Sequence, residues 1–146
     1  MNYGVELTIE KSFARNYYIM ANGSLFEAKY YAADGIWRNS RYNSNFITSL
    51  TAGKDFVFGK KKQWTFGLNA RTLWAGGERT WESDYEDHIK NYFRVDTRVS
   101  IARERQLIKW TFAIDIQNTT NRKNESTLEE IESAGILPVV SFRIEL

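Results

Sequence analysis

The 146-residue chain contains no cysteine, one proline and one histidine. Without cysteine it has neither disulfides nor thiolate metal ligands. A histidine-based metal cluster or a Ser-His-Asp triad would depend on His88 alone, which lies in a polar, loop-like segment. We therefore predict no enzymatic activity, no metal site and no bound cofactor.

The chain also lacks a strong net charge and a long apolar run. Lysine and arginine number 20 against 18 aspartate and glutamate residues, and the net charge of +2 is too small to favour a nucleic-acid partner. No stretch approaches the ~20 apolar residues of a membrane helix, and no basic start followed by an apolar segment indicates a signal peptide. The length fits one domain, and the aromatic content of 15% with a single proline favours β-strands.

The last nine residues, 138–146, carry the clearest structural pattern. Apolar and polar side chains alternate there, and the apolar ones are Val140, Phe142, Ile144 and Leu146. A period of two predicts a strand with one apolar and one polar face. An apolar stripe on an end strand invites unwanted pairing in water but suits a sheet that faces lipid. We therefore interpret these four residues as a membrane-insertion signal.

Six further segments are predicted to be strands, at residues 3–13, 17–30, 45–58, 64–74, 93–101 and 108–117. They show the same period of two, which Gly23 and Ala28 blur in the second segment. In the first segment, one face would hold Tyr3, Val5, Leu7, Ile9 and Phe13. The connections alternate between short (14–16, 59–62, 103–106) and long (31–44, 75–91, 118–137). We predict one domain, residues 1–146, with an all-β fold: an antiparallel up-and-down meander of about seven strands, with every short turn at one end.

Short turns at one end and long loops at the other are typical of outer-membrane β-barrels, which also carry aromatic girdles. Aromatic residues near the predicted strand ends are Tyr3, Phe13, Phe58, Trp64, Trp74 and Tyr92. We interpret the meander as a segment of a transmembrane β-barrel. Two alternatives remain: a soluble up-and-down barrel whose apolar face lines a cavity for a small apolar ligand, and an outer-membrane structural barrel without transport.

In each of the last three predicted strands, apolar and polar side chains occupy alternate positions, and this alternation predicts which side chains share a face. One face, towards lipid, would hold Trp110, Phe112, Ile114 and Ile116, and the other Arg94, Arg98, Asp115 and Arg143. Antiparallel order also places residues 34–42 and 76–79 at the same end of the sheet, opposite residues 60–62.

The first two long connections mix aromatic and charged residues, as ligand-binding loops do. The candidate extracellular ligand-loop residues are Trp37, Arg38, Arg41, Tyr42, Glu78, Arg79 and Trp81. Aromatic packing at a barrel rim is the alternative explanation. The acidic residues between 82 and 87 are interpreted as a solvated loop, with a Ca²⁺ site as the alternative. The lysines at 60–62 are interpreted as a solvated turn, with contact to lipid headgroups or phosphate as the alternative. In the third connection, Ser126 and Glu129 have the spacing of a helix capping box.

Five sequence pieces together resemble the C-terminal barrel portion of TonB-dependent outer-membrane receptors of Bacteroidetes-type bacteria. They are YGVELTIEK (3–11), DGIWRN (34–39), GGER (76–79), DIQNTTNR (115–122) and LPVVSFRIEL (137–146). The resemblance implies a 22-stranded barrel in the bacterial outer membrane, plugged by an N-terminal domain. It implies uptake of a small-molecule or glycan ligand with energy from TonB. The implied partners are outer-membrane lipid, the rest of the barrel with its plug, and TonB.

The sequence departs from that family pattern in two ways. Seven strands are fewer than 22, and the final residue is Leu146 where the family usually has an aromatic residue. Counting seven strands back from a C-terminus on the short-turn side puts Met1 at the long-loop end, whereas complete barrels have both termini on the periplasmic side. We therefore expect an incomplete barrel, with the plug and the N-terminal strands absent. Its sheet should be open and curved, or closed with distortion.

Overall fold

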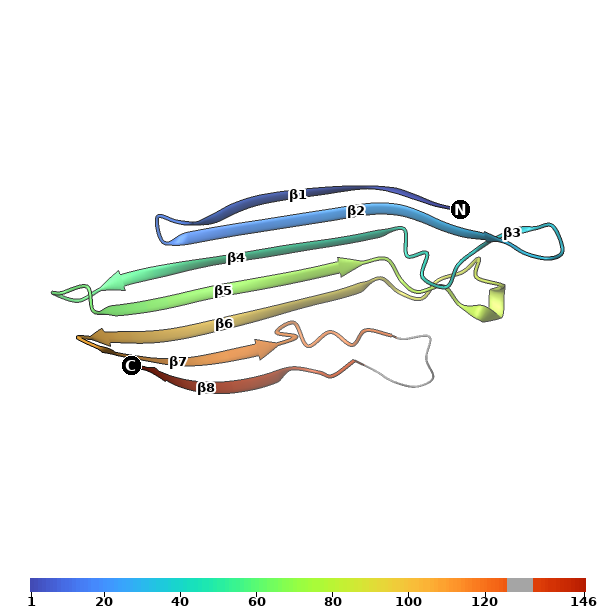
Figure 1. The fold of residues 1–146 in the computed structure, drawn as a ribbon. Helices are drawn as coiled ribbons and strands as arrows, with labels where there is room; N and C mark the ends of the chain where they lie inside the picture. The colour runs from blue at the N-terminus through green and yellow to red at the C-terminus, as the bar shows by residue number, and fades with distance from the viewer. Residues whose placement is uncertain (126–132) are drawn as a thin grey trace.

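The computed structural model of the protein describes residues 1–125 and 133–146. Over these residues the chain forms one antiparallel sheet (Figure 1). Its strands are β1 (Asn2–Ala14), β2 (Tyr17–Tyr31), β3 (Trp37–Asn39), β4 (Phe46–Phe58), β5 (Trp64–Ala75), β6 (Tyr92–Arg105), β7 (Ile108–Gln117) and β8 (Leu137–Glu145), with one 3₁₀ turn, η1 (Trp81–Ser83). No helix among the described residues is long and apolar enough to cross a membrane. The capping box expected at Ser126 and Glu129 lies outside the described residues.

The strands follow one another in the order β1-β2-β4-β5-β6-β7-β8. The predicted all-β up-and-down meander is therefore confirmed, with eight strands in place of seven. The additional strand is β3, which pairs with the end of β2 through Tyr31 and Trp37, whose rings lie 5.2 Å apart. A strand of three residues is too short to show a period of two in the sequence.

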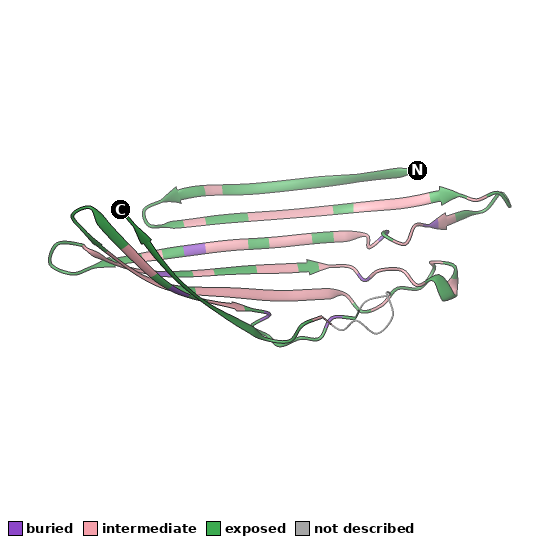
Figure 2. Ribbon diagram, turned by 60° about the horizontal axis from the view of Figure 1, so that its bottom comes forward, coloured by how far each residue is buried: buried purple, intermediate pink, exposed green. Residues whose placement is uncertain are grey.

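The sheet is open rather than closed. In the part of the chain that the structure describes, β1 pairs only with β2 and β8 only with β7. Of the two expected forms, the open one is therefore found. Figures 1 and 2 show that β7 and β8 curl away from the plane of the first strands.

The short turns have the geometry of tight hairpins. Arg15 and Asn16 both have positive φ, 55° and 62°, as a two-residue type I′ turn requires. The predicted turn at 103–106 is wrong in its bounds, because Arg103 and Arg105 still pair with β7 and the turn begins at Gln106.

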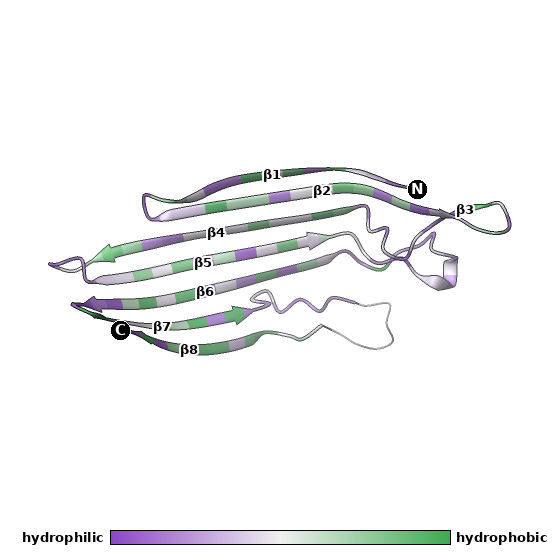
Figure 3. Ribbon diagram, in the orientation of Figure 1, coloured by the Kyte–Doolittle hydropathy of each residue, from purple (hydrophilic) through white to green (hydrophobic). Residues whose placement is uncertain are grey.

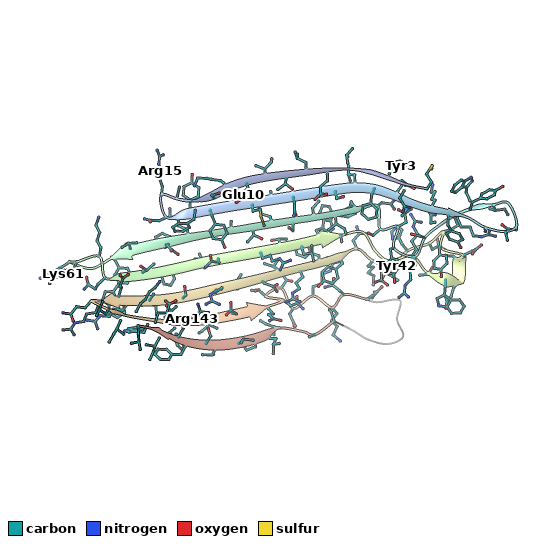
Figure 4. All side chains as sticks on the ribbon, viewed as in Figure 1. Tyr3, Glu10, Arg15, Tyr42, Lys61 and Arg143 are labelled. Carbon is teal, nitrogen blue, oxygen red and sulfur yellow. The ribbon has the colours of Figure 1, made fainter. Side chains whose placement is uncertain are left out.

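Arg15 and Lys61 lie at one end of the sheet and Tyr42 at the other (Figure 4). The predicted placement of the two long loops opposite residues 60–62 is confirmed.

The register fixes which side chains share a face. Phe112 pairs with Phe142 and Thr111 with Arg143, so Phe112 and Arg143 lie on opposite faces, as predicted. Following the pairs across the sheet gives an apolar face that includes Val5, Leu7, Ile19, Leu50, Phe56, Leu68, Val99, Ile101, Phe112, Ile114, Val140 and Phe142. The polar face includes Glu6, Asn22, Ser49, Thr51, Asn69, Arg71, Arg94, Asp96, Arg98, Asp115 and Arg143. Figure 3 shows the resulting alternation of hydropathy along the strands.

Phe13, which was predicted to share the apolar face of the first strand, does not lie there. The register shifts between Lys11 and Ala14, and Phe13 consequently turns to the polar face, where its ring lies 6.5 Å from that of Tyr18. A β-bulge adds a residue to one strand and so reverses the faces beyond it. Tyr92 pairs with Ala75 on the polar face.

Burial differs between the two faces of the sheet. On the apolar face Leu50 and Leu68 are each 46% exposed and Phe112 is 38% exposed, whereas the small residues Gly53, Gly67 and Ala113 are buried on the polar face (Figure 2). Ala113 is the only buried hydrophobic residue among those described. The polar face is therefore the inner, crowded side of the curve.

The total accessible surface agrees with a sheet that has no second layer. It amounts to 10669 Å², whereas a compact folded protein of 17.1 kDa exposes about 7,700 Å². Domains in water normally cover the apolar side of a sheet with another sheet or with helices. No such layer exists among the described residues.

Candidate functional site

The first two long loops dock onto each other and form one unit at the long-loop end, which we call the loop platform (residues 32–45 and 76–91). Its centre is Arg79, whose guanidinium donates to the carbonyl oxygens of Asn43 (3.0 Å) and Glu86 (2.6 Å) and to Asn45 Oδ1 (2.9 Å). The Arg79 backbone N–H donates to the carbonyl of Arg41 at 3.1 Å. One side chain thus connects both loops to the start of β4.

Beneath Arg79, the loop platform contains the fully buried side chain of Asn43. Its Oδ1 accepts the Ala28 N–H at 3.0 Å, and its Nδ2 donates to Asn39 Oδ1 at 2.8 Å. A buried amide is tolerated only when its donors and acceptors are paired. Asn43 meets that condition and fixes the first loop against the end of β2.

Two glycines allow the loop platform to pack this closely, Gly76 between the two loops and Gly77 within the second loop. A Cβ atom on Gly76 would overlap the carbonyl oxygen of Ser44, and one on Gly77 would overlap that of Ile89. Both obstacles are main-chain atoms, which cannot rotate away as a side chain can. The two glycines of the sequence GGER are therefore needed for the close backbone packing of the loop platform.

The predicted ligand-loop residues divide into two groups. Tyr42 and Trp81 are 70% exposed and Trp37 is 50% exposed, so their aromatic surfaces face outwards. The charged members are engaged within the loop platform: Arg38 forms ion pairs with Asp34 and Asp84, Arg41 lies 3.5 Å from Glu78, and Arg79 binds the carbonyls described above. The loop platform thus brings all seven predicted residues to one end of the sheet and leaves three aromatic rings exposed.

We expect acid to loosen the tip of the first loop below about pH 4. The hydrogen bond from Arg38 and the N–H of Ile36 lower the pKa of Asp34. The stability that this carboxylate contributes is therefore fully present above its unfolded pKa of about 3.9 and is lost as the pH falls through the lower folded pKa. The fluorescence of a variant in which Trp37 is the only tryptophan should stay constant from neutral pH to about pH 4 and change below it.

The matched control for this titration is Asp34→Asn, which keeps the size of the side chain and removes its charge. This variant should lack the acid transition and show the loosened signal at neutral pH already. A transition of the parent protein centred near neutral pH would contradict the assignment to Asp34.

The third loop is anchored by two buried asparagines, Asn118 and Asn124. The amide of Asn124 accepts the Phe93 N–H at 2.9 Å and donates to the Phe93 carbonyl at 3.0 Å, as a neighbouring strand would. Asn118 Nδ2 donates to the carbonyls of Arg122 (2.9 Å) and Ala134 (3.0 Å). The segment DIQNTTNR thus forms an ordered exit from β7.

A polar groove of about 420 Å³ runs along the inner face of the sheet. Polar side chains line it from β2, β4, β5, β6 and β7: Tyr18, Thr51, Asn69, Arg71, Arg94, Asp96, Arg98, Asp115 and Gln117. Arg98 binds Asp115 through both carboxylate oxygens, at 3.0 and 2.7 Å, and Arg94 Nε donates to Asp96 Oδ1 at 2.7 Å. Arg71 pairs across the strands with Asp96 and attracts its carboxylate electrostatically. The polar groove is therefore suited to hydrated polar groups and to anions.

Sequence reasoning placed charge on this face but did not select the polar groove as a site. The available signal was the alternation of Arg94, Asp96 and Arg98 within one strand. The pairing partners Asn69, Arg71 and Asp115 come from neighbouring strands and became recognisable only through the register. Among the described residues, no group of three or more histidine, cysteine, aspartate or glutamate side chains is arranged to hold a metal ion.

The outer, apolar face carries an aromatic belt near each end. At the long-loop end Phe46 packs edge-on against Trp74, with ring centroids 4.9 Å apart. At the short-turn end Trp64 lies between Phe58 (6.2 Å, stacked) and Trp110 (5.4 Å, edge-on). Between the two belts this face holds aliphatic side chains, the rings of Phe56 and Phe66 at 6.1 Å from each other, and Lys54.

The predicted insertion-signal residues lie at one edge of this apolar face. Val140 and Phe142 are each 63% exposed, Ile144 is 58% exposed and Leu146 is 97% exposed. They belong to β8 and to the residue that follows it, and the outer edge of β8 has no strand partner among the described residues.

Comparison with protein-family models, with curated proteins and with solved structures gave no match.

Proposed function

We propose that this chain forms part of the wall of an outer-membrane receptor barrel of the TonB-dependent type, in the bacterial outer membrane, and takes part in nutrient uptake. One observation carries the proposal: the sheet turns its apolar face outwards and its charged face inwards, with no second layer among the described residues. Exposed apolar area of this extent is unfavourable in water and favourable against lipid.

The spacing of the aromatic belts supports the same proposal. Trp74 lies ten positions after Trp64 along β5, which is about 33 Å of extended strand. At the ~40° tilt of strands in outer-membrane barrels this projects to about 25 Å, the height of the apolar band in such barrels. The two belts would then lie at the two membrane interfaces.

In this proposal each surface has its own partner. The apolar face contacts outer-membrane lipid, and the polar groove faces the barrel interior, where the plug lies. The exposed rings of Trp37, Tyr42 and Trp81 on the loop platform contact a small-molecule or glycan ligand outside the cell, and TonB acts through the plug. The free edges of β1 and β8 pair with further strands of the barrel, because unpaired backbone groups cost several kcal/mol each in hydrocarbon. The chain has no enzymatic role in this scheme.

The soluble alternative requires the opposite curvature. A soluble barrel would bury residues such as Leu68 and Phe112 on the inside, whereas here the buried positions, Gly53 and Ala113, lie on the polar face. An outer-membrane structural barrel without transport shares every feature of the sheet. A plug-encoding stretch upstream in the same reading frame would distinguish the receptor from it.

Paired cysteine variants test the proposal, since the chain has no cysteine of its own. Leu50→Cys and Thr51→Cys are adjacent in β4 and lie on opposite faces, and Val99→Cys and Ser100→Cys repeat the comparison in β6. Each variant is reconstituted in lipid vesicles, spin-labelled, and measured for its collisions with oxygen, which concentrates in lipid, and with a water-soluble nickel complex.

We expect the labels at positions 50 and 99 to collide mainly with oxygen and those at 51 and 100 mainly with nickel. Equal access of nickel to both members of each pair would refute the membrane proposal. A chain that stays monodisperse in water without detergent would do the same and would favour the soluble barrel.

A further inference from the structure

The short-turn end of the sheet holds a basic hollow that the proposed receptor function does not use. It measures about 540 Å³ and lies between the β4–β5 and β6–β7 turns. Its lining residues are Lys61, Lys62, Gln63, Arg103, Glu104, Arg105 and Gln106. Four cationic side chains face one carboxylate there, so the hollow carries a local excess of positive charge that the net charge of the chain does not reveal.

Arg103 is the member of this hollow that most clearly lacks a partner. Its side-chain Nε is buried and has no hydrogen-bond partner. On the apolar face it pairs across the strands with Trp64 on one side and Trp110 on the other, and its guanidinium lies 5.0 Å from the centre of the Trp64 ring. A buried donor without an acceptor is costly, and an anion would remove that cost.

Gln63 holds the β4–β5 turn against the end of β6. Its Oε1 accepts the Lys61 N–H at 2.9 Å, and its carbonyl accepts the Glu104 N–H at 2.9 Å. Lys62, near the end of the β4–β5 turn, has a left-handed backbone conformation with a φ of 53°. The lysines are therefore held beside the arginines of β6 by the backbone.

The surroundings of the hollow distinguish a lipid from a free anion. Phe58 is 47% exposed, Ile108 is 49% exposed, and Leu107 at the tip of the β6–β7 turn is 86% exposed. Trp64 and Trp110 of the aromatic belt lie directly beside Arg103. A free phosphate ion would use only the charges, whereas a phospholipid would use the charges with its headgroup and the apolar rim with its acyl chains.

We propose that this hollow binds the headgroup phosphate of an anionic phospholipid in the membrane leaflet that meets the short turns. The inference rests on the proposed function, because it needs the belt of Trp64 and Trp110 to lie at a membrane interface. Arg103 contacts the phosphate from the apolar face, with Lys61, Lys62 and Arg105 around it. Basic side chains at a membrane surface each strengthen such binding about five-fold.

The experiment uses tryptophan quenching by brominated lipids in the full chain reconstituted in vesicles. Replacing Trp37, Trp74 and Trp81 by phenylalanine leaves Trp64 and Trp110 beside the hollow as the only fluorophores, because the chain has five tryptophans. Brominated phosphatidylglycerol is compared with brominated phosphatidylcholine at equal mole fraction. A second variant that keeps only Trp74 reports on the opposite belt.

We expect phosphatidylglycerol to quench Trp64 and Trp110 more than phosphatidylcholine does, and to show no such preference at Trp74. Arg103→Gln should lower the relative affinity for phosphatidylglycerol about five-fold. The double variant Lys61→Gln/Lys62→Gln lies outside the strands and should lower it as well. Arg15→Gln, at the same end but in the β1–β2 turn, is the matched control and should change nothing.

Equal quenching by the two lipids would overturn the headgroup site. Competition by inorganic phosphate at constant ionic strength would assign the hollow to a free oxyanion and would also overturn it. If the cysteine pairs report insertion while the lipid preference is missing, only the headgroup site fails. If the cysteine pairs report no insertion, both proposals fail.

Discussion

Val140→Arg is expected to lower the free energy of unfolding of the membrane-inserted sheet by about 2–4 kcal/mol, the cost of an arginine on the lipid face near the middle of a bilayer. Val140 lies near the centre of β8 on the apolar face and is 63% exposed. Its neighbour Ser141 pairs with Ala113 on the polar face. Ser141→Arg places the same side chain at nearly the same depth in a polar environment and should cost much less.

The measurement is a denaturant titration of both variants in lipid vesicles. The difference in stability between the two variants is informative because its size depends on the solvent around Val140. In water, replacing an exposed valine by arginine removes apolar surface and is close to neutral. If Val140→Arg were tolerated as well as Ser141→Arg, β8 would not face lipid, and the interpretation of Val140, Phe142, Ile144 and Leu146 as an insertion signal would fail with it.

Gly77→Ala is expected to destabilise the protein by about 1–3 kcal/mol, the usual cost of forcing an extra methyl group into a packed site. The new Cβ would overlap the carbonyl of Ile89, a main-chain atom. Relieving the overlap separates the second loop from its own return segment and weakens the hydrogen bond from Gly77 N–H to Asn91 Oδ1 (3.3 Å). Because Arg79 follows two residues later, we also expect its contacts with the first loop to loosen.

Gly23→Ala serves as the control for this substitution. Its Cβ would meet only the Thr48 Cγ2 at 3.6 Å, an ordinary van der Waals distance. Denaturant titration should therefore separate the two alanine variants, and amide hydrogen exchange should show faster exchange at Asn43 and Arg79 in Gly77→Ala alone. Equal stability of the two variants would mean that the loop platform does not require the close approach at Gly77.

Most of the long strands could be predicted from the sequence because their side chains alternate between apolar and polar, although in β2 Gly23 and Ala28 blur this alternation. β7 was predicted to the residue, at 108–117. Three features could not be predicted from the sequence. β3 is too short to show a period of two, and the bulge before Ala14 moves Phe13 to the other face. β6 continues through charged residues that resemble a turn. In each case a local pattern was overruled by pairing with a neighbouring strand.

The candidate sites divide in a similar way. The sequence identified the aromatic residues Trp37, Tyr42 and Trp81, since their type and loop position are visible in one dimension. It could not identify the polar groove or the basic hollow, because Arg98 meets Asp115, and Arg103 meets Trp64, only across strands. The close backbone contacts at Gly76 and Gly77 likewise could not be predicted, because they form only when the loops pack against each other.

The sequence by itself determined that this protein is a meander of two-faced strands with short turns at one end, because side-chain parity and turn chemistry are local properties of the chain. Only the tertiary structure decided which face lies inside the curve. The alternation of apolar and polar side chains along a strand is the same in a barrel with an apolar interior and in one with an apolar exterior. The direction of curvature follows from register and crowding, with Gly53, Gly67 and Ala113 beneath the polar side chains, and these are properties of the whole sheet.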